Sequence, residues 1–204
     1  MPMTLDQIGI QHGTDKASGH HNYLATYDQY LEPRRGSLKT IMEIGVQTGA
    51  SLKLWRDYFP KANVLGIDCD PACGELKLGE RITVIIEDAA SREFWSGLNK
   101  LCVFEIIIDD GSHELAQTKV ALEYAWPLVA PGGLYIIEDL HSIFHPKYCQ
   151  PGVNAEQDER WSLFTNRIQN MSEGAPALCG NADQSQCSIR FMHFYRSLLI
   201  IGKR

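Results

Sequence analysis

Two apolar runs near the middle of the chain each end abruptly in a pair of carboxylates. The first is Ile106-Ile107-Ile108-Asp109-Asp110, and the second is Tyr135-Ile136-Ile137-Glu138-Asp139. Apolar runs of this kind are typical of strands in a parallel sheet that is buried on both faces, and ligands bind outside the carboxyl ends of such strands. We therefore expect both acid pairs to open into one cleft.

Four acids in one cleft need a counter-charge, because like charges a few ångströms apart raise one another's pKa. A hard divalent cation, which prefers oxygen ligands, would supply that charge. The sequence therefore predicts a metal site where the two acidic strand ends meet.

The surrounding chain predicts an α/β fold. From about residue 39, short apolar runs alternate with longer helix-like segments, as in strand-helix-strand units of a parallel sheet. We expect a doubly wound, Rossmann-like sheet, mostly parallel, with an antiparallel hairpin at the C-terminal end. The expected strands are residues 40–46, 63–68, 82–87, 104–109 and 133–138, the expected helices are 50–58, 92–101 and 114–126, and the hairpin strands are 188–193 and 197–203.

Two regions fall outside this alternation. Residues 1–38 are expected to form an N-terminal cap, with a helix in 20–30 beside the mouth of the cleft. Residues 145–187 are polar and punctuated by Pro and Gly, and are expected to form a substrate lid or insertion. We therefore expect residues 1–204 to form a single domain.

The charge and composition of the chain disfavour several classes of protein. The net charge is −6 and no block of Lys and Arg stands out, so a nucleic acid is not an expected partner. No apolar run approaches the ~18 residues of a membrane span, and the N-terminus lacks a basic segment followed by an apolar one. The six cysteines form no Cys-x-x-Cys pair, which is typical of reduced thiols. We expect a soluble, cytoplasmic protein that does not bind membranes.

The first expected strand leads into a glycine-containing loop, Glu43-Ile44-Gly45-Val46-Gln47-Thr48-Gly49-Ala50-Ser51. Gly45 and Gly49 allow a tight turn and a close approach to a ligand. The dinucleotide fingerprint would have a second glycine where this chain has Gln47, which argues against a bound pyrophosphate. Glu43, just before the loop, favours a cationic or amino-bearing ligand instead.

Two further strand ends suit a nucleoside. Asp68 lies 23 residues beyond Gly45, close to the spacing at which an acid accepts hydrogen bonds from ribose hydroxyls. Asp88, after the third strand, is placed to accept from an adenine amino group. Alternatively, the glycines serve only helix packing and Asp68 only caps a helix.

These features together resemble a class I S-adenosylmethionine-dependent methyltransferase. Four segments are similar, more narrowly, to the metal-dependent sugar O-methyltransferases of macrolide biosynthesis, which include the enzymes for mycinamicin and tylosin and relatives described as cephalosporin hydroxylases. The segments are Gly13-Thr14-Asp15-Lys16 and residues 51–60, 108–113 and 131–140.

The resemblance implies S-adenosylmethionine and Mg²⁺ as cofactors, and a homo-oligomer that methylates a hydroxyl of a sugar-bearing or polyhydroxylated small molecule. It matches Asp110, Glu138 and Asp139 to the Mg²⁺ ligands and His113 to the general base. His141 departs from the family, which carries a polar amide after this strand, and is a competing base or a fourth ligand. The residues expected to bind the cofactor are Glu43, Gly45, Gly49, Ser51, Asp68, Asp88 and Asp109.

Two alternatives remain open. A catechol-type O-methyltransferase would use the same cofactor and metal on an aromatic diol. A non-catalytic protein could retain the cofactor fold, although the acidic triad argues against it. The glycine pattern disfavours an NAD-dependent oxidoreductase.

Overall fold

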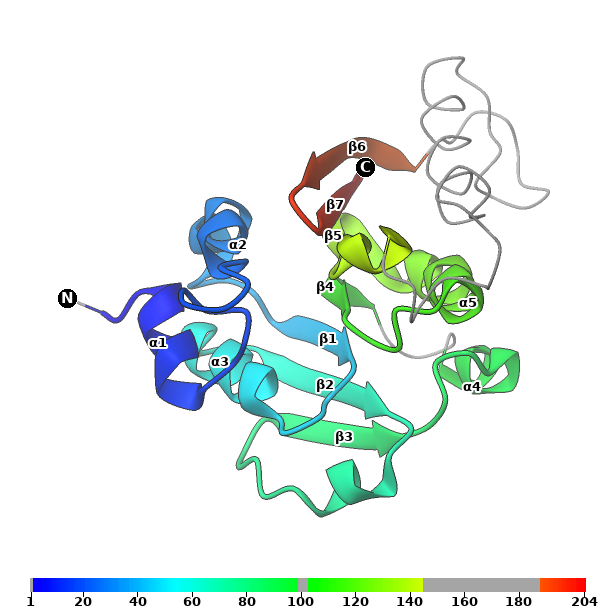
Figure 1. Ribbon diagram of the computed structural model, residues 1–204, viewed down its shortest axis with the longest axis horizontal. Coiled ribbons are helices and arrows are strands. Elements are labelled where there is room, and N and C mark those ends of the chain that lie inside the picture. Colours follow the sequence, from blue (N-terminus) through cyan, green and yellow to red (C-terminus); the bar gives the residue numbers. More distant parts are fainter. Residues whose placement is uncertain (1, 99–102, 145–187) are drawn as a thin grey trace.

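A single seven-stranded sheet forms the centre of the computed structural model, which describes residues 2–98, 103–144 and 188–204 (Figure 1). The strand order is β3-β2-β1-β4-β5-β7-β6. The first five strands pair in parallel, while β7 pairs antiparallel with both β5 and β6. The predicted doubly wound sheet with a C-terminal hairpin is therefore confirmed. The strands are β1 Thr40–Ile44, β2 Asn63–Asp68, β3 Ile82–Ile86, β4 Phe104–Asp109, β5 Val129–Ile137, β6 Ile189–Tyr195 and β7 Leu198–Lys203.

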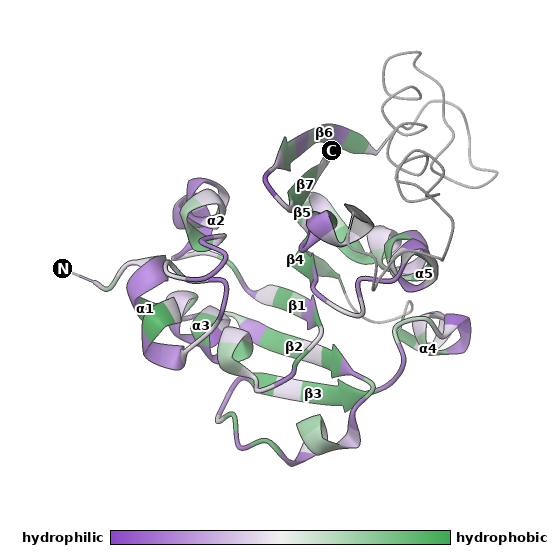
Figure 2. Cartoon of the chain, in the orientation of Figure 1, coloured by the Kyte–Doolittle hydropathy of each residue, from purple (hydrophilic) through white to green (hydrophobic). Residues whose placement is uncertain are grey.

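Helices cover both faces of the sheet, with α1, α2 and α3 on one side and α4 and α5 on the other (Figure 1). The strand side chains alternate between the two cores: Ile106 and Ile108 join the first core and Ile107 the second, and all three are fully buried. Apolar residues accordingly concentrate in the strands (Figure 2). The helices are α1 Leu5–His12, α2 Leu24–Leu31, α3 Ala50–Tyr58, α4 Arg92–Leu98 and α5 Leu115–Ala125, with short 3-10 turns at Glu32–Arg34, Pro71–Glu75, Trp126–Leu128 and Leu140–Phe144.

The N-terminal region shares the main core. Helix α1 was not among the expected helices, although a capping box between Thr4 and Gln7 marks its start in the sequence. Helix α2 buries Leu24, Tyr27 and Leu31 in the same core as α3. The described part of this region, residues 2–38, therefore belongs to the layer that covers one face of the sheet.

Strand β5 begins earlier than the sequence predicts. The sequence predicts a strand from residue 133, but β5 starts at Val129 and runs through Pro131-Gly132-Gly133. The pairing register between β4 and β5 shifts between Phe104 and Ile106, and Gly132 has a positive φ of 74°. An irregularity of this kind accommodates a proline that cannot donate to the ladder.

Some expectations concern residues that the structure does not describe. The predicted lid at 145–187 and the end of the predicted helix at 92–101 lie outside the described residues. Within the described ranges, no helix has the length and apolar character needed to cross a membrane. The cytoplasmic location stays a prediction.

Gly45 brings two strand ends into direct contact. Its φ is +93°, and a Cβ at this position would lie 2.1 Å from the carbonyl oxygen of Asp110. The Asp110 amide donates to the Ile44 carbonyl at 3.0 Å, so the loop after β4 rests on the loop after β1. The absence of a side chain at Gly45 therefore serves a contact within the chain, whatever ligand binds nearby.

We predict that Gly45→Ala lowers the free energy of unfolding by about 3 kcal/mol, because it combines a left-handed backbone with a clash against immobile main chain. The matched control is Gly132→Ala, where φ is +74° but no atom lies within 4 Å of the new Cβ. That control should cost only about 1 kcal/mol. Urea denaturation measures both values, and equal losses would contradict the role assigned to Gly45.

Candidate functional site

A cavity of about 470 Å³ opens at the carboxyl ends of the parallel strands. This volume is in the range that small-molecule ligands occupy. Asp110 and Asp139, from the ends of β4 and β5, both line it, so the expected meeting of the two acidic strand ends in one cleft is confirmed for these residues. The predicted site residues that line the cavity are Gly45, Ser51, Asp68, Asp88, Asp110, His113 and Asp139.

The other predicted site residues are not among those that line this cavity, and their roles stay predictions. Glu43, Asp109 and Glu138 are buried. Gly49 starts α3 with a φ of +72°, and a Cβ there would lie 2.5 Å from a methyl carbon of Leu78. The side chain of His141 is 52% exposed, with its Nδ1 3.2 Å from the Ser197 hydroxyl.

Asp68 fixes the glycine-containing loop. Its Oδ2 accepts hydrogen bonds from the amides of Val46 at 2.8 Å and Gln47 at 3.1 Å, and its Oδ1 accepts from Asp70 at 2.9 Å. Burial alone would raise the pKa of Asp68, but these backbone bonds lower it below its usual value. The carboxylate thus stays ionised. Oδ2 already accepts two hydrogen bonds, so Oδ1 is the oxygen that can still accept from a ligand hydroxyl.

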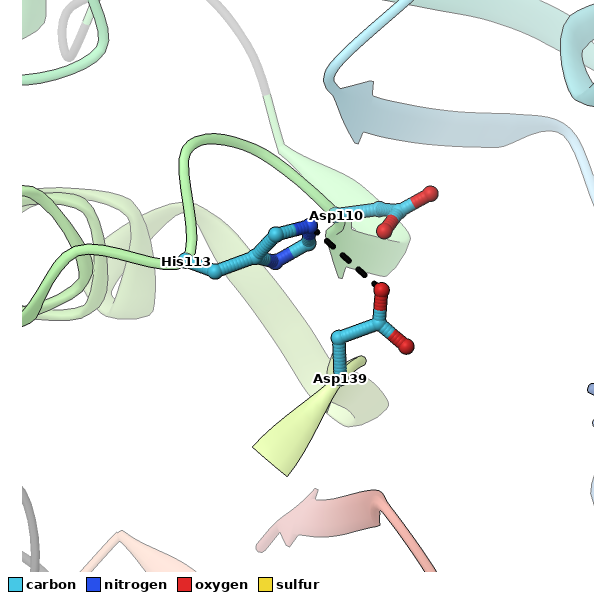
Figure 3. A group of neighbouring side chains, drawn as sticks. All are labelled: Asp110, His113 and Asp139. Atoms are coloured by element: carbon cyan, nitrogen blue, oxygen red, sulfur yellow. Dashed lines mark ion pairs between the residues drawn. The ribbon is translucent and has the colours of Figure 1, made fainter. Parts of the chain in front are cut away.

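Asp110, His113 and Asp139 form a group that can hold a cation. Each offers one ligand atom, and the three atoms lie within 4.8 Å of one another. Figure 3 shows the His113 ring directed at Asp139, with Nε2 and Oδ2 3.4 Å apart. His113 and Asp139 both have positive φ, 61° and 56°, a region that is uncommon for residues other than glycine but that Asp and His enter more readily than most.

The donor set fits Mg²⁺. This ion is usually held by one or two carboxylates and completes its shell with water or substrate oxygens. Asp110 and Asp139 supply two carboxylates at the cavity wall.

Lys16 is the functional residue that the sequence analysis missed. Its side chain is 1% exposed, and its Nζ lies 2.5 Å from Asp110 Oδ2, 3.0 Å from Glu138 Oε2 and 3.3 Å from Glu43 Oε1. Burial alone would lower the pKa of Lys16, but the three carboxylates raise it well above its usual value, so the ammonium stays charged.

This contact corrects the argument from charge. The sequence suggested that a divalent cation supplies the counter-charge for the acids, whereas for Glu43, Asp110 and Glu138 an ammonium of the chain itself supplies part of it. The segment Gly13-Thr14-Asp15-Lys16 was singled out only for its resemblance. Neither the periodicity of apolar residues nor the spacing of motifs could show that Lys16 contacts strands that come later in the chain.

Aromatic donors complete the shell around the acids. Tyr27 donates its hydroxyl to Glu138 Oε1 at 2.5 Å, and Tyr23 donates to Asp139 Oδ1 at 2.5 Å. Trp55 Nε1 donates to Glu43 at 2.7 Å. Burial raises the pKa of Tyr27, which keeps its hydroxyl protonated as a donor. Both Glu138 oxygens are thus engaged by the chain.

Comparison with known proteins supports the resemblance. The chain is 30% identical over 98% of its length to 8-demethyl-8-alpha-L-rhamnosyl tetracenomycin-C 2'-O-methyltransferase from Streptomyces olivaceus. It is 32% identical over 98% of its length to L-olivosyl-oleandolide 3-O-methyltransferase from Streptomyces antibioticus. The chain is a homologue of these sugar O-methyltransferases. In both cases it covers 54% of the relative, so it spans about half the length of the curated relatives it matches.

Solved structures of the MycE methyltransferase from the mycinamycin biosynthetic pathway share this fold. One, in complex with Mg and SAH, has a TM-score of 0.85 and 25% identity, and the alignment covers 100% of this chain and 54% of MycE. Another contains Mg, SAH and mycinamycin VI, with the same TM-score of 0.85. No protein-family model matches the chain.

In this methyltransferase homologue, Asp109 provides a pH-dependent stability term. Asp109 faces the second core, where Tyr135 donates to its Oδ2 at 3.0 Å, and burial raises its pKa from 3.8 to about 7. Between these values the folded protein holds a proton that the unfolded chain has lost. The free energy of unfolding therefore falls as pH rises through this window, by up to about 1.4 kcal/mol per pH unit.

We predict that Asp109→Asn removes this slope, because asparagine stays neutral and still accepts from Tyr135. Urea denaturation at intervals from about pH 4 to about pH 8, in the presence of a chelator, measures the difference between the wild-type protein and the variant. Parallel pH profiles for the two proteins would contradict the raised pKa of Asp109.

Proposed function

We propose that this chain carries an S-adenosylmethionine- and Mg²⁺-dependent O-methyltransferase site that acts on a hydroxyl of a sugar-bearing or polyhydroxylated small molecule in natural-product biosynthesis. One observation carries the proposal. A single cavity joins the nucleoside-type residues Asp68 and Asp88 to the group Asp110, His113 and Asp139. A methyl donor and a hydroxyl acceptor could therefore meet inside it.

The order of the strands divides the cavity into a half proposed for the cofactor and a half proposed for the acceptor. Asp68 and Asp88 follow the adjacent strands β2 and β3, and are proposed to bind the ribose hydroxyls and the adenine amino group. Asp110 and Asp139 follow the adjacent strands β4 and β5, and are proposed to face the acceptor. The loop at Gly45 lies between these halves, where β1 ends.

His113 is proposed to take the proton of the acceptor hydroxyl. Its Nε2 lies 3.4 Å from Asp139 Oδ2, so the carboxylate can orient the ring and stabilise the imidazolium after proton transfer. Asp110 and Asp139, with Glu138 as the third predicted ligand, would hold Mg²⁺, and the ion would supply positive charge that lowers the pKa of the hydroxyl. Alignment of the acceptor oxygen with the methyl group of S-adenosylmethionine should account for much of the rate of methyl transfer.

The names of the relatives favour a sugar acceptor. The two relatives described above are named for rhamnosyl and olivosyl compounds, and the MycE complex contains mycinamycin VI. A caffeoyl-CoA O-methyltransferase from Staphylococcus aureus, at 16% identity and a TM-score of 0.61, shares the fold alone. The catechol-type alternative is therefore not favoured.

A homo-oligomer remains part of the proposal, to be checked by light scattering.

Calorimetric titration tests the proposal. S-adenosylhomocysteine should bind the protein, and glycosides rather than catechols should bind in turn when Mg²⁺ is present. Asp139→Asn should abolish turnover and leave S-adenosylhomocysteine affinity nearly unchanged, because it alters only the acceptor half of the site. Absence of cofactor binding, or full activity in excess chelator, would overturn the methyl-transfer role or the metal role respectively.

The two candidate bases can be separated by parallel substitution. We predict that His113→Ala lowers kcat by about a hundredfold or more, the usual loss on removal of a general base, without weakening S-adenosylhomocysteine binding. His141→Ala should lose much less, because His141 is half-exposed and is not among the residues that line the cavity. The reverse order of the two losses would assign the base to His141.

A further inference from the structure

Lys16 joins parts of the chain that are distant in sequence. It lies between α1 and α2, and its Nζ contacts Glu43 on β1, Asp110 after β4 and Glu138 after β5. Its side chain is 1% exposed. Transfer of an ammonium to such a site costs several kcal/mol in lost hydration unless well-placed anions compensate.

The acids around Lys16 exceed what one ammonium neutralises. Three carboxylates face a single positive charge, and an ammonium has three N–H donors. Two of these donors make hydrogen bonds, to Asp110 and Glu138. Glu43 Oε1 is buried without a hydrogen-bond partner, although it lies 3.3 Å from Nζ. The cluster therefore holds more carboxyls than its one ammonium can pair, and burial raises the pKa of both Glu43 and Glu138.

Asp110 connects this cluster to the cavity. One of its oxygens, Oδ2, contacts Lys16, and the same side chain belongs to the cation-binding group with His113 and Asp139. Lys16 and Asp110 both line the cavity, so the ammonium lies beside the group that can hold a cation. A cation at the cavity wall and the ammonium would share the same anions.

We propose that Lys16 is a positioning residue and internal counter-ion. It holds Asp110 and Glu138 together when no divalent cation is bound, and it weakens cation binding by competing for the same negative charge. The inference rests on the proposed function only for the identity of the cation. The role of Lys16 in holding the three carboxylates together stands on the contacts alone.

Lys16→Met tests the inference, because methionine nearly preserves the length of the stem and removes the charge. In chelator, Tm should fall by about 10 °C, since the buried Glu43 and Glu138 and the part-exposed Asp110 lose their counter-charge. Added Mg²⁺ should raise the Tm of the variant by several degrees more than that of the wild-type protein, and calorimetry should show about tenfold tighter Mg²⁺ binding. Lys39→Met, at an exposed lysine, is the control and should change neither quantity.

A second substitution covers a variant that does not fold. Glu43→Gln removes one negative charge and can still accept from Trp55, so Lys16→Met/Glu43→Gln should be more stable in chelator than Lys16→Met. The inference is overturned if Lys16→Met is as stable as the wild-type protein, or if neither Mg²⁺ nor Glu43→Gln restores its stability. Failure of the wild-type protein to bind Mg²⁺ would instead count against the proposed metal, while the Glu43→Gln comparison still decides the role of Lys16.

Discussion

The buried ion cluster around Lys16 is the interaction on which the arrangement of the site depends. One ammonium contacts carboxylates from the ends of three parallel strands, and Tyr27 and Trp55 donate to two of the same acids. Because an unpaired charge in a dry interior is costly, docking of the N-terminal region and burial of these strand ends stabilise each other. The fold and the site are therefore stabilised by the same contacts.

Backbone contacts supply the second constraint. Gly45 permits the loop after β4 to lie on the loop after β1, and Asp68 ties the β1 loop to the end of β2 through amide hydrogen bonds. Residues that pattern analysis assigns to ligand binding thus also hold the loops together. A site built in this way is preorganised, since its loops are fixed by the chain before a ligand arrives.

The sheet and its strand ends could be predicted because they follow from local pattern. Apolar runs of the right length, interrupted by helical periods, specify a parallel sheet, and such a sheet brings the ends of β4 and β5 together. That reasoning placed Asp110 and Asp139 in one cavity. The same reasoning could not show that the side chain of Asp109 points into the second core, where Tyr135 donates to it. Side chains alternate between the two faces of a sheet, so the face that Asp109 occupies can be predicted only when the last residue of the strand is known. The start of β5 was likewise misplaced, because the sequence pattern does not fix the ends of a strand.

The sequence by itself determined the fold class, the homology to sugar O-methyltransferases and the edge of the sheet at which chemistry would occur. Only the tertiary structure decided which acids reach the cavity and which are neutralised inside the protein. The physical reason is the range of the interactions. Strand and helix patterns are local, whereas the partner of a buried charge is chosen by packing, and 94 residues separate Lys16 from Asp110. A lysine in an N-terminal segment carries no local mark of the carboxylates that it will neutralise.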